Sequence, residues 1–209
     1  MRKILPVILF VLLSCNAHAS SYQVEMIIFE HLYPDVDSEL WLAGQNLPDL
    51  TDSIELAADQ SSSTAFQSLP AHKYILGNIY GALKTSKSYR PLLHIAWQQP
   101  ALTSSRAENV HIRKVEGVSE QDNFQDAFVK VDGIVRIRAS TFLHADIDLA
   151  YFFQSVPASQ IAVGNVNIDP QRANFVRLTE SRRMKLNELH YFDHPLFGVV
   201  MRVSRFGGE

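Results

Sequence analysis

The chain has 209 residues and a formal net charge of −3, and 46% of its residues are hydrophobic, which is ordinary for a globular protein. An acidic total argues against non-specific binding to nucleic acid. The single cysteine, Cys15, excludes an internal disulfide and leaves the rest of the chain without a thiolate metal ligand or a cysteine nucleophile.

The N-terminus has the pattern of a secretory signal peptide. Two basic residues precede an apolar run from residue 4 to residue 13, which is too short to span a bilayer, and a small-residue cleavage motif ends at Ala19. We therefore expect removal of residues 1–19 and a single periplasmic domain over residues 20–209. The sequence LLSC also resembles a lipobox in which Cys15 would be lipidated, but the cleavage motif at Ala19 is favoured.

Strand patterns dominate the exported part of the chain. YQVEMIIFE (22–30) and YRPLLHIAWQQP (89–100) are rich in β-branched and aromatic residues, and VHIRKV (110–115) predicts a shorter strand. No further segment is long and apolar enough to predict a membrane span.

One segment has the periodicity of a helix. Its apolar residues recur at helical spacing, at Leu76, Ile79, Tyr80 and Leu83. Pro70 suits a first helical turn, so the principal helix is expected over about residues 71–86. Two glycines four residues apart, Gly77 and Gly81, indicate close packing of this helix on a sheet.

The second half of the chain predicts hairpins. Residues 131–153 form two strands around a turn near residues 140–142. One face of the pair carries Ile134, Arg136, Arg138, His144, Asp146 and Asp148. Residues 175–206 supply two more strands. The fold expected is α+β, with a mainly antiparallel sheet of consecutive hairpins and one principal helix.

Common catalytic motifs are missing from the sequence. It contains no G-x-S-x-G elbow, no S-x-x-K, no H-E-x-x-H, no glycine-rich phosphate loop and no dinucleotide fingerprint. We therefore assign no catalytic residue, no cofactor and no metal, and we expect a protein that is not an enzyme.

The sequence HYFDHP raises the question of a metal site. His190 and His194 have the i, i+4 spacing that can share a metal on a helix, with Asp193 beside them. Pro195 pushes the residue before it into extended geometry, which argues against a helix. A structural turn made by His190, Asp193, His194 and Pro195 is therefore favoured, and a metal or acid–base site is the alternative.

The cations of the second half are the candidate ligand-binding residues. Residues 170–209 contain seven bases and four acids. Guanidinium groups are planar forks suited to carboxylates, which an exported ligand such as peptidoglycan carries. The candidates are Arg136, Arg138, Arg177, Arg182, Arg183 and Lys185. Alternatively, the arginines pair across the sheet with acidic residues of the chain itself, namely Asp146, Asp148, Glu180 and Glu188.

Five stretches carry a family resemblance, in the same order along nearly the whole exported chain. They are YQVEMIIFE, LWLAGQNLPDL, YRPLLHIAWQQP, VDGIVRIRASTFLHADIDLAYF and ESRRMKLNELHYFDHPLFGVVMRV, of which the last is the most specific. Together they resemble the CsiV family, the peptidoglycan-binding cell-shape integrity proteins of the gamma-proteobacterial periplasm.

This resemblance implies a non-enzymatic factor that binds peptidoglycan and supports its synthesis. The implied route is an outer-membrane lipoprotein activator of a bifunctional penicillin-binding protein. No contact residues are carried over from the family. Two other functions stay open on sequence alone: a protein-interaction adaptor whose wall binding is incidental, and a wall hydrolase that uses His190 or His194 with Asp193.

Overall fold

The structure is a computed structural model that describes residues 21–34, 46–57, 65–117, 128–157 and 175–207. The predicted signal peptide and the Cys15 lipidation site lie outside these residues. The elements in chain order are β1 (Ser21–His31), β2 (Ser53–Ile54), β3 (Gln67–Ser68), the 3-10 helix η1 (Ala71–Lys73), α1 (Gly77–Thr85), β4 (Tyr89–Pro100), β5 (Asn109–Glu116), β6 (Phe128–Ala139), β7 (Leu143–Pro157), β8 (Phe175–Met184), β9 (Leu189–His194) and β10 (Phe197–Arg205).

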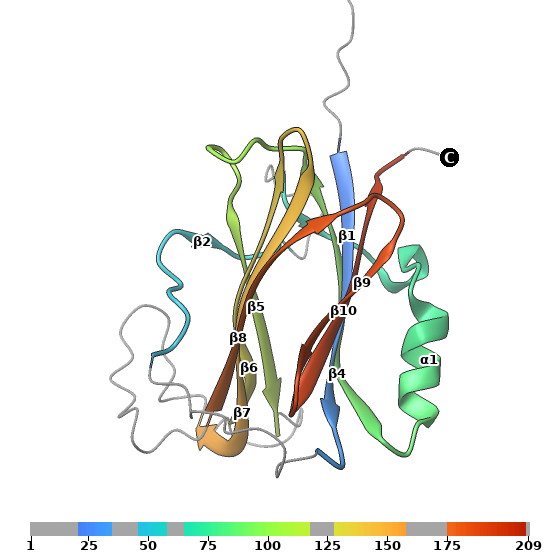
Figure 1. The fold of residues 1–209 in the computed structure, drawn as a ribbon, viewed down its shortest axis with the longest axis vertical. Coiled ribbons are helices and arrows are strands. Elements are labelled where there is room, and N and C mark those ends of the chain that lie inside the picture. Colours follow the sequence, from blue (N-terminus) through green and yellow to red (C-terminus); the bar gives the residue numbers. More distant parts are fainter. Residues whose placement is uncertain (1–20, 35–45, 58–64, 118–127, 158–174, 208–209) are drawn as a thin grey trace, which may run out of the picture.

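The strands form two five-stranded sheets that face each other (Figure 1). The first sheet has the order β3-β4-β1-β10-β9, and the second has the order β2-β5-β6-β7-β8. Pairings between the long strands are antiparallel. The predicted α+β class with mainly antiparallel strands and one principal helix is confirmed. The division into two sheets was not predicted from the sequence. In the second sheet β5 to β8 are neighbours in chain order, whereas in the first sheet β1 pairs with β4 and β10, which are distant from it in the sequence.

Side-chain alternation explains the second sheet. On β6 and β7, the inward side chains of Val135, Ile137, Ala145 and Ile147 are buried, as the hairpin pattern predicted. The polar residues between them face outward. In this arrangement one side of each strand joins the core while the other side stays available for charged groups.

The first sheet is covered on both sides. Eight consecutive residues of β1, from Gln23 to Glu30, are buried. Val24, Met26 and Ile28 face the core between the sheets. Gln23 and Glu25 face outward and contact the segment around η1: the Gln23 amide donates to the Lys73 carbonyl at 2.9 Å.

The core between the sheets holds large apolar side chains. Trp97 of β4, Phe192 of β9 and Phe197 of β10 are each fully buried. Burial of one such side chain stabilises the fold by about 1.5–3 kcal/mol. The Trp97 indole nitrogen donates to the Gln99 side chain at 2.8 Å, which satisfies its polar atom inside the core.

A buried polar cluster also joins the two sheets. Tyr151 of β7 donates its hydroxyl proton to Glu30 of β1 at 2.7 Å, and Arg90 of β4 pairs with the same carboxylate. Lys130 of β6 lies 3.4 Å from Glu30. Burial acts to raise the pKa of Glu30, but the hydrogen bonds from Tyr151 and Arg90 outweigh it and hold the pKa below its usual value.

The helix is shorter than predicted. η1 covers Ala71–Lys73, and α1 begins only at Gly77, because Tyr74 between them is extended with ψ of 136°. Outside the first sheet, α1 lies beside β4 (Figure 1). A Cβ on either Gly77 or Gly81 would meet nothing within 4 Å, so the interpretation that these glycines allow close packing is wrong.

The last segment contains three strands where two were predicted. β8 belongs to the second sheet, whereas β9 and β10 form a hairpin in the first. The chain crosses between the sheets at the turn after β8, where Asn187 has a φ of 66°. Asparagine tolerates this left-handed conformation better than most residues, and the sequence LNEL therefore ends one strand and starts the next.

Candidate functional site

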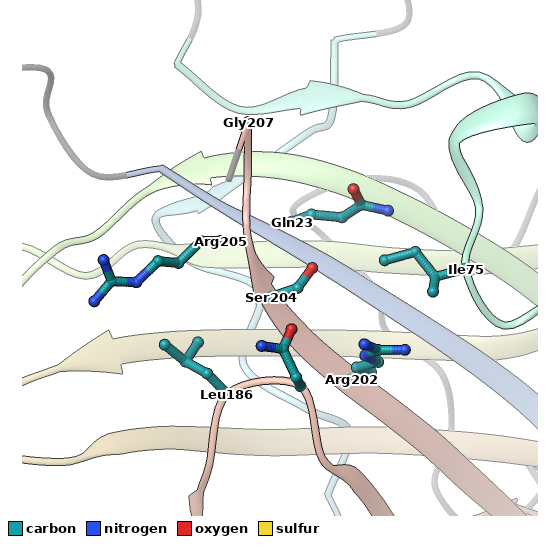
Figure 2. Close-up of a pocket in the computed structure, with 8 residues that line it drawn as sticks. Gln23, Ile75, Leu186, Arg202, Ser204, Arg205 and Gly207 are labelled. Carbon is teal, nitrogen blue, oxygen red and sulfur yellow. The ribbon is translucent and has the colours of Figure 1, made fainter. Parts of the chain in front are cut away.

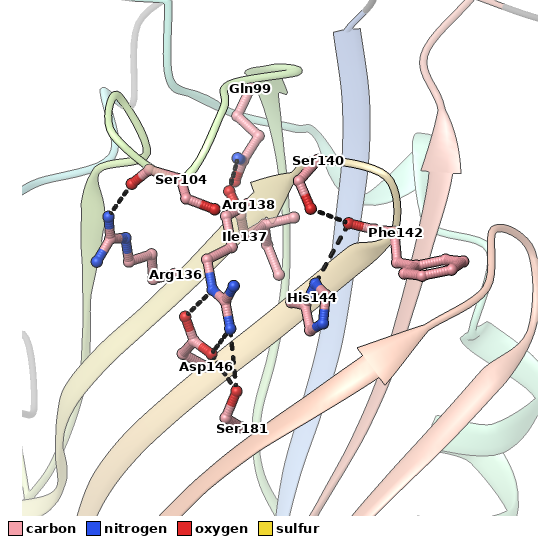
Figure 3. A network of polar contacts seen from close by, with 10 residues as sticks. All are labelled: Gln99, Ser104, Arg136, Ile137, Arg138, Ser140, Phe142, His144, Asp146 and Ser181. Atoms are coloured by element: carbon pink, nitrogen blue, oxygen red, sulfur yellow. Dashed lines mark hydrogen bonds and ion pairs between the residues drawn. The ribbon is translucent and has the colours of Figure 1, made fainter.

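The arginines predicted as ligand contacts lie on the outer face of the second sheet, and their partners are already present there. Figure 3 shows Arg138 of β6 gripping Asp146 of β7, with hydrogen bonds of 2.7 and 3.1 Å from two of its nitrogens. Ser181 of β8 donates to the same carboxylate at 2.5 Å. Burial acts to raise the pKa of Asp146, but the bonds from Arg138 and Ser181 outweigh it and lower the pKa.

A second pair on this face repeats the arrangement. Arg177 of β8 donates twice to Asp148 of β7, at 2.5 Å for each oxygen, and Thr179 adds a bond at 3.1 Å. Arg136 donates to the Ser104 carbonyl (Figure 3). These guanidinium groups therefore fix neighbouring strands and a loop to one another.

The remaining predicted cations are also engaged. Arg182 points toward the first sheet, where it donates to the Tyr191 carbonyl of β9, and it also donates at 2.8 Å to Glu180 of its own strand, β8. Arg183 points to the opposite face, with its guanidinium 3.2 Å from the centre of the Phe142 ring. Lys185 pairs with Glu188 at 3.2 Å. Asp146 and Asp148 thus pair with arginines across the sheet, as the alternative interpretation expected, whereas Glu180 pairs with Arg182 of its own strand and Glu188 pairs with a lysine three residues away.

The residues of HYFDHP do not converge on one point. His190 accepts from the Lys185 N–H at 3.3 Å, and His194 accepts from the Leu196 N–H at 3.2 Å. Asp193 accepts instead from the Tyr191 hydroxyl at 2.5 Å. Pro195 begins the turn between β9 and β10. No group of three or more potential metal ligands occurs within the residues that the structure describes.

The outer face of the first sheet carries a cavity of about 590 Å³. Three parts of the chain enclose it: the outward side chains of β1 and β10, the segment before α1, and the turn between β8 and β9 (Figure 2). Its lining residues are Gln23, Ile75, Leu186, Asn187, Arg202, Ser204, Arg205 and Gly207.

The polar side chains of this cavity have unused hydrogen-bonding groups. Arg202 is partly buried, and its Nε is buried without a hydrogen-bond partner. Ser204 is 7% exposed, and within the described residues no hydrogen bond to its hydroxyl is seen. The Gln23 amide nitrogen donates to the Lys73 carbonyl, and the described part of the chain supplies no donor to the Gln23 carbonyl oxygen. The cavity therefore offers a cation, a hydroxyl and an amide oxygen.

The nearest acidic side chain is occupied elsewhere. Glu25 is the cross-strand neighbour of Arg202 and only 1% exposed. Its carboxylate accepts from the backbone N–H groups of Ile75 and Leu76 at 2.6 and 2.7 Å, and it pairs with His94 at 2.8 Å. These three bonds draw the carboxylate toward α1, and no ion pair with Arg202 is present.

The candidates from sequence omitted the cavity's residues because they are scattered. Gln23 lies on the first strand and Ser204 on the last, although they are paired in the sheet. The available signal was alternation: Gln23 and Glu25 in QVE, and Arg202 and Ser204 in RVS, each flank an apolar residue. Only the pairing of β1 with β10 shows that these polar positions share one face.

An aromatic cluster with two exposed tyrosines lies elsewhere on the same outer face. Phe29 stacks on Tyr191 with ring centres 6.0 Å apart, and Tyr89 meets Phe29 edge-on at 5.3 Å. Tyr89 and Tyr191 are 40% and 41% exposed. A Cβ on Gly198 would come within 2.7 Å of the Phe29 and Tyr191 rings, so the glycine makes room for the stack.

Comparison with known families identifies the chain. A family model described as "Peptidoglycan-binding protein, CsiV" matches residues 3–206, which is nearly the whole sequence. The chain belongs to the CsiV family. Comparison with curated proteins and with solved structures found no match.

The CsiV match indicates peptidoglycan as the ligand to consider for the surfaces described above. The family is described by binding and not by a reaction. In the described residues, no helix is long and apolar enough to cross a membrane. For this CsiV protein, the question is then which surface meets the wall.

Proposed function

We propose that this CsiV protein is a non-enzymatic accessory factor of the periplasm that binds peptidoglycan and supports wall assembly and cell shape. The family match over residues 3–206 carries the proposal. The signal-peptide pattern of residues 1–19 supports export, and residues 20–209 act as one domain.

Sacculus co-sedimentation tests the binding. The chain purified after export is mixed with purified sacculi over a series of salt concentrations, and the muropeptides of each pellet are then analysed. We expect salt-sensitive pelleting, because salt screens contacts between arginine and carboxylate, and an unchanged muropeptide pattern. Sacculi digested to soluble fragments are the control, and the protein should then stay in solution.

Two results would contradict the proposal. Absence of pelleting at low salt would remove wall binding and favour the adaptor function. New muropeptides would show hydrolysis, and His190→Ala would then test whether that residue takes part.

We further propose that the protein acts through an outer-membrane lipoprotein activator of a bifunctional penicillin-binding protein, as the family resemblance implies. The exposed rings of Tyr89 and Tyr191, which pack against the buried Phe29, support a protein contact, since aromatic rings are enriched in interfaces. Periplasmic crosslinking should recover the lipoprotein with the wild-type chain. Tyr89→Ser with Tyr191→Ser should reduce that crosslink and leave sacculus pelleting unchanged; an unchanged crosslink would exclude this surface.

A further inference from the structure

We propose that the cavity around Arg202 binds the terminal carboxylate of a short peptide, of the kind that the peptide stems of peptidoglycan present. The identity of the ligand rests on the proposed function. The location of the site rests on the structure alone, because it follows from the polar groups that the fold leaves without partners.

The first argument is the state of Arg202. On the outer face of the second sheet, Arg138 and Arg177 each grip a carboxylate of the chain with two hydrogen bonds. Within the described residues, no hydrogen bond or ion pair of the Arg202 side chain is seen, and its Nε is also shielded from water. Burying a charged donor without an acceptor is unfavourable, and an arriving anion would remove that cost.

The second argument is that the fold keeps its own carboxylate away from Arg202. Glu25 lies opposite Arg202 in the sheet but is held by Ile75, Leu76 and His94. A carboxylate with three such partners is not free to neutralise the arginine. The positive charge of Arg202 is therefore directed into the cavity, which Arg205 also lines.

The third argument is the mixture of groups in the lining. A guanidinium fork binds a carboxylate through two parallel bonds. The Ser204 hydroxyl and the Gln23 carbonyl can bind the amide next to that carboxylate, and Ile75 and Leu186 offer apolar contact for a small side chain such as a methyl group. Figure 2 shows Gln23, Ser204 and Arg202 along the two central strands, with Ile75 and Leu186 on either side.

The size of the cavity agrees with such a ligand. About 590 Å³ falls within the range of roughly 300–1,000 Å³ that small-molecule sites occupy. A sugar chain could pass outside while one peptide end enters. The described residues hold no acidic side chain in the lining, so an anionic group meets no like charge there.

The test is titration calorimetry of the exported chain with a soluble stem tetrapeptide that ends in D-alanine, compared with the same peptide as its C-terminal amide. We expect the acid to bind at least about tenfold more tightly than the amide, since only the acid presents a charged acceptor to the fork. Arg202→Gln should lower the affinity for the acid about tenfold. Arg202→Lys keeps the positive charge but loses the forked guanidinium, so its affinity for the acid should lie between those of the wild type and Arg202→Gln.

The matched control is Arg183→Gln, an exposed arginine on the outer face of the second sheet. It should leave peptide affinity unchanged. Circular dichroism and the unfolding midpoint of each variant show whether the fold is intact. Equal affinity for the acid and the amide, or equal loss in the Arg202 and Arg183 variants, would overturn the assignment.

Sacculus pelleting separates this inference from the proposed function. Pelleting without peptide binding would mean that the wall is bound through another surface, so the cavity assignment fails while the function stands. Peptide binding without pelleting would mean that the cavity is a carboxylate site and that wall binding fails. Loss of both would reject both.

Discussion

Arg138 and Arg177 on one outer face of the sandwich differ from Arg202 on the other in whether the chain supplies a carboxylate partner. On the second sheet, Arg138 and Arg177 are matched by Asp146 and Asp148 on the neighbouring strand. On the first sheet, Arg202 has a carboxylate as its cross-strand neighbour, but that carboxylate is bound to the segment before α1. The number of cations on a face therefore says little about ligand binding. What matters is whether the fold has already satisfied them.

The same comparison distinguishes arginines that stabilise the fold from an arginine that can bind a ligand. Cross-strand ion pairs hold β6, β7 and β8 in register and leave little for a ligand to gain. An arginine side chain without a partner does not stabilise the fold through an ion pair, but all of its hydrogen-bond donors are available to a bound anion. Four changes test this division.

The largest effect is expected for Glu25→Ala. The change removes the acceptor of two backbone N–H groups and of His94 in a site that is 1% exposed. We expect the free energy of unfolding to fall by about 3 kcal/mol, measured by urea denaturation. Glu188→Ala, at an exposed pair, should change it by less than about 0.5 kcal/mol. A small effect of Glu25→Ala would mean that this carboxylate does not anchor the segment before α1.

Asp146→Asn should have the next largest effect. It removes a charge that Arg138 and Ser181 bind, and we expect a loss of about 1–2 kcal/mol at neutral pH. The pKa of Asp146 is lowered in the folded protein, so its contribution is complete above about pH 4 and is lost as the pH falls through the lowered pKa. The difference between wild type and variant should therefore shrink in acid. A difference independent of pH would contradict the ion pair.

Glu55→Gln should have a smaller effect with the opposite dependence on pH. His111 of β5 lies between Asp132, at 2.6 Å, and Glu55. Burial acts to lower the pKa of His111, but the hydrogen bonds that its ring donates to Asp132 and Glu55 outweigh this effect, and the pKa is raised.

This stabilisation is fully present below about pH 6.5 and is lost as the pH rises through the raised pKa. Glu55→Gln should then cost less than about 1 kcal/mol in weakly acidic solution and almost nothing at high pH. Urea denaturation over a range of pH measures the change. A cost that grows with pH would contradict a charged His111.

The smallest effect on stability is expected for Arg202→Met. The arginine has no partner to lose, and its stem is replaced by a chain of similar length, so the free energy of unfolding should stay within about 0.5 kcal/mol of wild type. Arg138→Met, which leaves Asp146 without its arginine, should cost about 1–2 kcal/mol. Equal costs would show that Arg202 has a structural role and would remove the contrast between the faces.

Local pattern predicted much of the fold. The alternation in VRIRA and LHADIDL placed Arg136, Arg138, Asp146 and Asp148 on one face, and the structure confirms it. The helix was predicted too long, because propensity does not show that Glu25 binds the N–H groups of Ile75 and Leu76 just before it. The crossing between sheets after β8 was missed, because it depends on the left-handed turn at Asn187.

The candidate site was harder to predict than the fold. Sequence reasoning selected arginines by residue type and by their place near the C-terminus. Arg177 and Arg182 proved to be bound within the chain, and the cavity residues were not selected. Residue type reports what a side chain can bind, whereas its neighbours decide whether that capacity is still free.

The class of the fold, the faces of its strands and membership of the CsiV family could be read from the amino-acid sequence, because these depend on local periodicity and on the order of residues along the chain. Which cations are neutralised and which polar groups meet depends on the three-dimensional fold. Gln23 and Ser204 are far apart in the chain, and a sheet register brings them together. Charge pairing and cavity formation depend on such long-range contacts. They can therefore be assigned only once the pairing of β1 with β10 in the first sheet is known.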